Sequence, residues 1–165
     1  MNASLEQMKE YRITKYDPRR RNADGSYLDD DWTSFSDVGK SSGDDCLTIE
    51  QYKVVESAYV QTAVDFMLES GGDELVAVDI ENAANTELGF RPGTPLKNSE
   101  LMDAMRLVLR ELCWARFEDS DGRFVHFGWD YYMYVGVTTE CPNAERAAAQ
   151  RGLFVESFRS PYHHD

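Results

Sequence analysis

The sequence predicts a single α+β domain in which helices pack on one face of a mainly antiparallel sheet. Some stretches repeat apolar residues every three or four positions, as amphipathic helices do, whereas others are rich in aromatic and β-branched residues, as strands are. A turn containing Asp121-Gly122 joins two aromatic-rich stretches, and no regular βαβα repeat is present. A chain of 165 residues, 42% hydrophobic, can bury one core, so we expect one domain, 1–165, with the order β-α-β-α-β-β-α-β.

The amino-terminal part is expected to hold a short strand and a long loop. Residues 10–16 (EYRITKY) are rich in aromatic and branched side chains, which favours a strand. Asp17-Pro18 ends this strand, and the loop that follows extends over about 17–46. Such a long loop is functional, disordered, or contains a short element that the pattern does not reveal.

A helix and a buried strand follow this loop. Thr48 is a suitable N-cap with Gln51 three positions later, and apolar residues then recur at spacings of three and four. This pattern predicts a helix over 48–69. The compact apolar run 74–80 (ELVAVDI) is typical of a buried strand.

The middle of the chain predicts a second loop, a second helix and a hairpin. Residues 82–97 carry Asn, Gly and two prolines, as loops do. Asn98 or Ser99 can cap a helix over 99–112, in which the apolar residues form one stripe. The stretches CWARFED and RFVHFGWDYYMYVGV, on either side of the Asp-Gly turn, predict a hairpin whose second strand is unusually long.

Alternation along this long strand places its residues on two faces. The face expected to join the core holds Val125, Phe127, Trp129, Tyr131, Met133 and Val135. The opposite face holds Phe124, His126, Gly128, Asp130, Tyr132 and Tyr134. Gly128 can mark a bulge, which would exchange the two faces beyond it.

The carboxyl-terminal part is expected to hold a short helix, a last strand and a tail. Pro142-Asn143 opens an Ala-rich helix over 143–151, and 153–158 (LFVESF) reads as the last strand. Residues 160–165 are expected to form a flexible tail, as terminal residues usually do.

The charge of the chain limits its partners. The chain has 17 basic and 30 acidic residues, a net charge of −13. It repels the phosphates of nucleic acid and anionic lipid, because binding either requires Lys or Arg to replace counterions. We therefore expect neither nucleic acid nor a membrane as partner. The absence of a long apolar run and of a signal-peptide pattern favours a cytoplasmic protein.

The sequence contains no motif of known chemistry. Cys46, Cys113 and Cys141 are widely spaced and form no CxxC pair, so we expect free thiols rather than disulfides or a zinc site. An EF-hand-like frame puts Arg20 at the first ligand position, which disfavours calcium. Phosphate-binding glycine loops, nucleophile elbows and zinc-protease motifs are absent. We expect a non-enzymatic protein without catalytic residues, metal or cofactor.

Negative charge is concentrated between Asp24 and Glu50, where eight acidic residues stand against Lys40, a net charge of −7. A patch of one sign steers a basic partner, and aromatic side chains within it can anchor that partner. The expected partner-binding residues are Asp29, Asp30, Asp31, Trp32, Phe35, Asp37, Asp44 and Asp45. Alternatively, the stretch is a solvated loop whose aromatic residues pack back onto the core.

A second candidate site is the face with His126, Asp130, Tyr132 and Tyr134, where titratable groups gather at strand spacing. In a groove beside the hairpin, these groups can bind a small molecule or act as acid and base. Alternation alone, however, also puts polar groups on the solvent side of a half-buried strand. A concave pocket containing them favours this site, whereas a convex acidic surface favours a protein partner.

The segments YRITKYDP, DDDWTSFSDVG, DYYMYVG and GLFVESFRSPY, in this order, resemble those of small bacterial proteins that are encoded near polymorphic toxins and regarded as their immunity proteins. The resemblance spans nearly the whole chain but assigns no role to single residues. It implies a cytoplasmic, non-enzymatic protein that blocks a toxin by covering or displacing its active site. A third possibility is a structural protein that self-associates through exposed tyrosines or a sheet edge.

Overall fold

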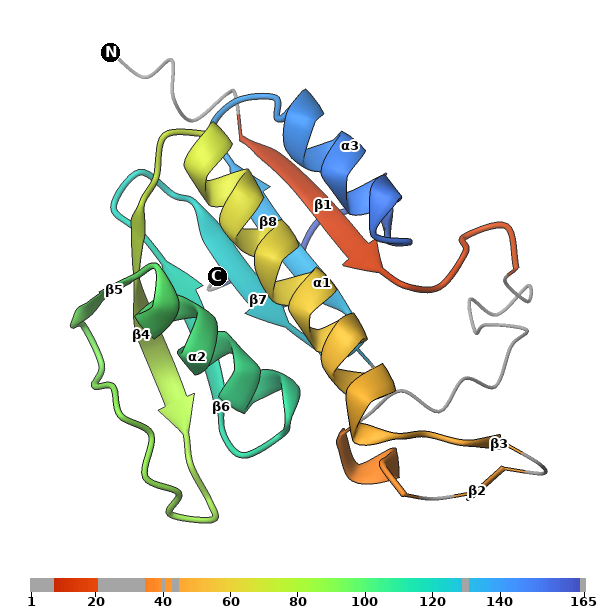
Figure 1. Cartoon of the computed structure of the whole chain (residues 1–165). Coiled ribbons are helices and arrows are strands. Elements are labelled where there is room, and N and C mark those ends of the chain that lie inside the picture. Colours follow the sequence, from red (N-terminus) through yellow and green to blue (C-terminus); the bar gives the residue numbers. More distant parts are fainter. Residues whose placement is uncertain (1–7, 21–34, 40, 43–44, 129–130, 164–165) are drawn as a thin grey trace.

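The fold is described by a computed structural model that covers residues 8–20, 35–39, 41–42, 45–128 and 131–163. Within these residues, three helices pack on one face of a seven-stranded antiparallel sheet, which confirms the expected α+β class (Figure 1). The strands follow one another across the sheet in the order β5-β4-β6-β7-β8-β1-β9. They are β1 (Lys9–Thr14), β4 (Glu74–Glu81), β5 (Pro95–Lys97), β6 (Trp114–Glu118), β7 (Phe124–Phe127), β8 (Met133–Val137) and β9 (Phe154–Ser157). The helices are α1 (Ile49–Glu69), α2 (Ser99–Leu109) and α3 (Pro142–Gln150).

Helix α1 lies across the middle of the sheet, between α2 and α3 (Figure 1). Its first turn carries the expected capping box: Thr48 Oγ1 accepts from the Gln51 amide at 3.1 Å, and Gln51 Oε1 accepts from the Thr48 amide at 2.9 Å. Its inner side buries Tyr59 and Phe66 against the sheet. Among the described helices, none has both the length and the apolar character needed to cross a membrane.

Both expected loops contain short elements. The described part of the 17–46 loop holds the 3-10 helix η2 (Phe35–Asp37) and a small hairpin of β2 (Ser41–Ser42) and β3 (Asp45–Cys46). These correspond to the hidden short elements that the length of the loop suggested. The 82–97 loop ends in β5, which forms one edge of the sheet.

The prediction of one long second strand in the hairpin was wrong. The structure divides it into β7 and β8, which pair with each other from Phe124↔Gly136 to Phe127↔Met133. A turn separates them, in which the Gly128 amide donates to the Tyr132 carbonyl at 2.8 Å and Tyr131 adopts a φ of 65°. The chain thus reverses its direction after Gly128. The sequence did not predict this turn, because a pattern of aromatic and branched residues typical of a strand continues through it.

Despite this reversal, the described strand residues that were expected to face the core still lie on one face of the sheet. Phe127 and Met133 are six positions apart and are also cross-strand partners, so both remain on the same face of the sheet. Four of the expected core residues on these strands, and Tyr131 in the turn, are buried in the main core: Val125, Phe127, Tyr131, Met133 and Val135. Trp129 lies outside the described residues.

The face of the sheet opposite the helices is covered in part by the end of the chain. After β9, the Phe158 amide donates to the Glu10 carbonyl at 3.2 Å and the Ser160 amide donates to Glu10 Oε1 at 3.1 Å. Arg116 Nη1 donates to the Tyr162 carbonyl at 3.0 Å. The expectation of a flexible tail was therefore wrong for residues 160–163, because hydrogen bonds and ring contacts hold them on the sheet; 164–165 lie outside the described residues.

Gly136 provides a test of this second packing layer. A Cβ at Gly136 would clash with Cε1 of Phe124, whose buried ring stacks on His126 at a centroid distance of 4.2 Å. We expect Gly136→Ala to lower the free energy of unfolding by about 2 to 3 kcal/mol in urea titrations, because the ring cannot move without disturbing the layer. Phe124→Leu introduced together with Gly136→Ala should recover part of the loss, and a single variant as stable as the parent would contradict this packing.

Candidate functional site

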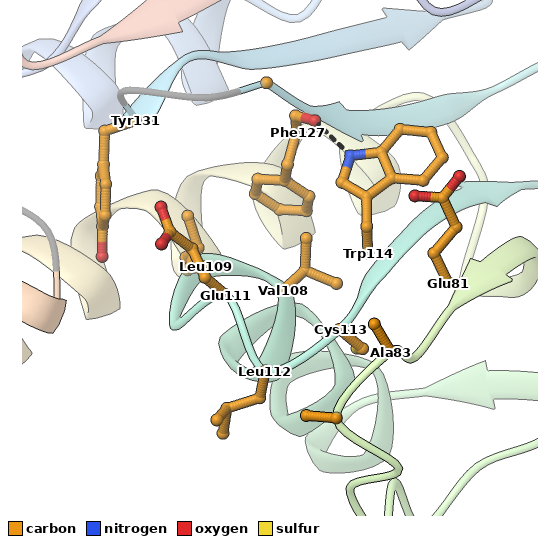
Figure 2. Close-up of a pocket in the computed structure, with 12 residues that line it drawn as sticks. Glu81, Ala83, Val108, Leu109, Glu111, Leu112, Cys113, Trp114, Phe127 and Tyr131 are labelled. Carbon is orange, nitrogen blue, oxygen red and sulfur yellow. Dashed lines mark hydrogen bonds between the residues drawn. The ribbon is translucent and has the colours of Figure 1, made fainter.

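One candidate site is an apolar pocket of about 240 Å³ where β4 and β7 end and α2 passes into β6. We call it the Trp114 pocket. Its inner surface is formed mainly by Val108 and Leu109 of α2, Trp114 of β6 and Phe127 of β7, with the Tyr131 ring at one end (Figure 2). This site could not be predicted from the sequence, because its walls come from four separate elements, β4, α2, β6 and β7, together with Tyr131.

Trp114 is held in place as one wall of the pocket. Its indole nitrogen donates a hydrogen bond to the Phe127 carbonyl at 2.9 Å, which Figure 2 shows as a dashed line. Its ring also lies 5.7 Å from the ring of Tyr162, in the carboxyl-terminal segment. The indole therefore presents a fixed face to the pocket rather than a freely rotating side chain.

Two residues of the pocket have an unusual backbone conformation. Glu111 has a φ of 61° and Tyr131 a φ of 65°, the left-handed region that favours glycine. At Glu111 this conformation ends α2, since the Leu112 amide donates to the Leu107 carbonyl at 3.0 Å. Backbone strain of this kind collects at functional sites when surrounding contacts maintain it.

The rim of the pocket is negatively charged. Glu81 and Glu111 are exposed and lie at opposite ends, Glu81 beside Trp114 and Glu111 toward Tyr131 (Figure 2). No lysine or arginine is among the described residues that line the pocket. The pocket thus combines an apolar interior with two carboxylates at its mouth.

The thiol in the wall of the pocket is not activated for nucleophilic attack. Cys113 is 7% exposed, and burial raises the pKa of its thiol to about 11, so the thiol is protonated at neutral pH and is a poor nucleophile. No histidine is among the described lining residues. Elsewhere in the described part of the chain, no three His, Cys, Asp or Glu side chains are placed to hold a metal ion.

A buried polar network supports the pocket from behind. The Tyr131 hydroxyl donates to the Tyr52 hydroxyl at 2.6 Å, and the Tyr59 hydroxyl donates to the Tyr131 carbonyl at 2.9 Å. Glu56, only 2% exposed, accepts from Arg110 Nε at 2.7 Å and from Arg110 Nη2 at 2.9 Å. Burial is the main cause that raises the pKa values of Tyr52 and Tyr131. The network ties the end of α2 and the β7–β8 turn to α1.

The described part of the acidic stretch lies against this network. The Phe35 ring of η2 meets the Tyr52 ring edge-on at 5.3 Å, and the Arg110 guanidinium lies 5.0 Å from the Phe35 ring centre. Phe35 is therefore half-buried and packs against the core, as the alternative interpretation of the stretch expects for its aromatic residues, and its role as an anchor for a partner stays a prediction. Tyr52 in turn accepts a hydrogen bond from Tyr131, so Tyr52 stands between Phe35 and a side chain that lines the Trp114 pocket.

The other expected partner-binding residues are only partly described. Asp37 ends η2 and is half-buried, and Asp45 belongs to β3, where it pairs with Ser42. Asp29, Asp30, Asp31, Trp32 and Asp44 lie outside the described residues. Their role in partner binding stays a prediction.

The second expected site is neither an open groove nor a solvent-facing side of the strand. His126 is fully buried, with Nδ1 2.8 Å from Ser160 Oγ and Nε2 3.2 Å from Glu118 Oε1. Tyr134 is buried as well, with its ring 5.9 Å from that of Tyr162. Tyr132 is half-buried in the turn, and Asp130 lies outside the described residues. The carboxyl-terminal segment thus covers the place where a ligand would have to enter.

No family model matches the chain, and neither a curated protein nor a solved structure was found to be similar to it. The resemblance to immunity proteins therefore stays a prediction. The Trp114 pocket and its network are the features on which a functional argument can build.

The Glu56–Arg110 pair was not predicted from the sequence, although the position of Glu56 in the helix pattern indicates a buried carboxylate. Glu56 stands four positions after Tyr52 and three before Tyr59, on the buried stripe of the 48–69 helix. A carboxylate on such a stripe needs a buried cation, because an unpaired charge is too costly to bury. The sequence cannot show, however, which arginine supplies that cation.

Removing one partner of the Glu56–Arg110 pair should lower the free energy of unfolding more than removing both. Arg110→Met leaves Glu56 buried with only Arg106 nearby, at 3.7 Å, and should lower the free energy of unfolding by about 3 kcal/mol in urea titrations. The double variant Glu56→Leu and Arg110→Met should recover most of that loss. Arg146→Met, at an exposed position of α3, is the control and should change stability by less than about 0.5 kcal/mol. Additive losses in the double variant would contradict the pairing.

The buried thiol predicts a loss of stability in alkaline solution. Burial raises the pKa of Cys113 from 9.0 to about 11, so above pH 9 the unfolded chain releases this proton while the folded chain retains it. The contribution of the protonated Cys113 thiol to the free energy of unfolding is complete below pH 9. It falls by about 2 kcal/mol as the pH rises toward 11. Urea titrations between pH 8 and about 10.5 should show a smaller decline for Cys113→Ala than for the parent. Cys46→Ala, at an exposed thiol, should behave like the parent.

Proposed function

We propose that this protein is a non-enzymatic binding protein that recognises a basic protein through its acidic surface, as an immunity protein or inhibitor recognises a toxin. The proposal implies a cytoplasmic location, where such a toxin would act. The observation that supports it most directly is that most of the arginines are paired with carboxylates of the same chain.

Seven of the twelve arginines form ion pairs with carboxylates of the same chain within the described residues. They are Arg12, Arg19, Arg106, Arg110, Arg116, Arg123 and Arg151. Two of them are almost entirely inside the fold, since Arg116 is 2% exposed and Arg123 is 7% exposed. Cations that are paired or buried oppose an approaching basic protein very little, so the surplus of carboxylates determines the field outside the molecule.

The position of the acidic stretch supports the same function. Its described part contacts Tyr52 and Arg110 through Phe35; Tyr52 is bonded to Tyr131, and Arg110 precedes Glu111, both of which line the Trp114 pocket. Charges that lie within about one Debye length, roughly 8 Å at physiological salt, act together on a partner. An apolar pocket beside an acidic surface has the composition of a protein interface, in which charge steers and apolar contacts hold.

The two other functions receive less support. A small-molecule site or cryptic enzyme at His126 and Tyr134 would require the carboxyl-terminal segment to leave the sheet. In the seven-stranded sheet, the described edge strands that could support self-association are β5 and β9, which have three and four residues. Edge strands this short offer few backbone groups to another copy.

Salt-dependent capture followed by rate measurements tests the proposal. Lysate of the source cell is passed over the immobilised protein at about 50 mM salt and eluted at about 500 mM, and a retained basic protein is purified and studied by stopped flow. The variant Asp29→Asn, Asp30→Asn and Asp31→Asn should lower its association rate about tenfold or more at low salt.

The control variant removes the same number of charges elsewhere. Asp73→Asn, Glu74→Gln and Glu140→Gln are exposed positions at the opposite end of the sheet from the pocket and should lower the rate less than about threefold. Equal effects of the two variants would contradict the mapping to the acidic stretch. If no basic protein is retained at low salt, the proposed function is wrong.

A further inference from the structure

We infer that the Trp114 pocket binds a long aliphatic cation, specifically the side chain of an arginine or lysine that the basic partner inserts into it. The source of the side chain rests on the proposed function. The preference of the pocket for such a group rests on the pocket alone.

The interior of the pocket suits an aliphatic stem. Val108, Leu109 and Phe127 present apolar surface in a space of about 240 Å³, enough for three or four methylene groups and a terminal cation. Burying methylene groups against such a surface is favourable, and Arg and Lys commonly bury their stems while the charge stays near water.

The rim selects for positive charge. Glu81 and Glu111 stand at the two ends of the pocket, and neither forms an ion pair with a described cation. An ammonium or guanidinium group at either end therefore meets a carboxylate without displacing an existing partner. An anionic ligand would be repelled at both ends, and a neutral ligand would gain nothing from them.

The fixed indole adds to this selection. Because its nitrogen is engaged with the Phe127 carbonyl, Trp114 offers its ring rather than a hydrogen-bond donor to the occupant. A cation near the face of an indole is attracted by the ring quadrupole, and tryptophan is the strongest of the aromatic side chains in this respect. The wall and the rim therefore favour the same kind of ligand.

The pocket is held in shape before a ligand arrives. Tyr131 is fixed by hydrogen bonds with Tyr52 and Tyr59, and the residue before Glu111 is fixed by the bidentate contact of Arg110 with Glu56. Binding to a site that is already ordered avoids the entropy cost of arranging its side chains. A single inserted side chain can then contribute strongly to an interface, as arginines often do.

Titration with small probes tests the chemistry of the pocket without the partner. The full chain, labelled with ¹⁵N, is titrated with butylguanidinium, butylammonium, 1-butanol and pentanoate, which share one butyl stem. We expect the two cations to shift the amide signals of Leu112 and Trp114 with millimolar affinity, butanol to bind about tenfold or more weakly, and pentanoate not to bind.

Variants of the two rim carboxylates test whether they cause the preference for cationic probes. Glu81→Gln and Glu111→Gln should each weaken butylguanidinium binding by about three- to tenfold, and both together should remove the difference between butylguanidinium and butanol. Glu100→Gln, at an exposed position near the start of α2 that does not line the pocket, is the control and should leave the affinity unchanged. Equal binding of butanol and the cations by the parent, or no binding of any probe, would overturn the inference.

The partner experiment separates this inference from the proposed function. With a captured basic protein, Glu81→Gln and Glu111→Gln should raise the dissociation rate about tenfold while the association rate changes less than with the acidic-stretch variant. An unchanged dissociation rate would contradict the insertion of a partner's side chain into the Trp114 pocket but would leave the proposed function intact. Selective binding of the cationic probes by a protein that retains no basic partner would overturn the proposed function and identify a free amine or guanidine as the occupant.

Discussion

The buried carboxylate of Glu56 is the point at which three parts of the fold are joined. Arg110 reaches it from the end of α2, and Tyr52, one turn earlier on α1, connects it with Tyr131 in the β7–β8 turn. Phe35 covers Tyr52 and Arg110 from the outside. A charged pair in such a place stabilises little by itself, but it fixes one relative position of the helices, which a purely apolar contact would specify less strictly.

The sheet differs from the usual half-solvated antiparallel sheet, because both sides of its centre are buried. The helices cover one side, and residues 158–163 cover Phe124, His126 and Tyr134 on the other. Gly136 makes this second layer possible by leaving room for the Phe124 ring. As a result, the sheet contributes its ends and its connecting turns to the functional surface, and the Trp114 pocket lies at one of these ends.

The parts of the fold that follow from local pattern could be predicted, and those that depend on distant contacts could not. The capping box at Thr48 and Gln51 and the Asp121-Gly122 turn are contained within a few residues, so the sequence predicts them correctly. The burial of His126, in contrast, involves Ser160, which is more than thirty residues away in the sequence. Likewise, no local pattern places Glu81 and Glu111 at one pocket, since the sheet and α2 bring them together.

The position of β1 between β8 and β9 determines when this protein can complete its fold. Lys9 pairs with Val137 and Thr14 pairs with Phe154, so both neighbours of β1 are distant from it in the sequence. On the ribosome, β1 has no neighbour in the sheet until the segments that form β8 and β9 have been synthesised. Closing so long a loop is slow compared with forming helices or hairpins. We therefore expect β1 to join the sheet later than the strands that pair with near neighbours in the sequence.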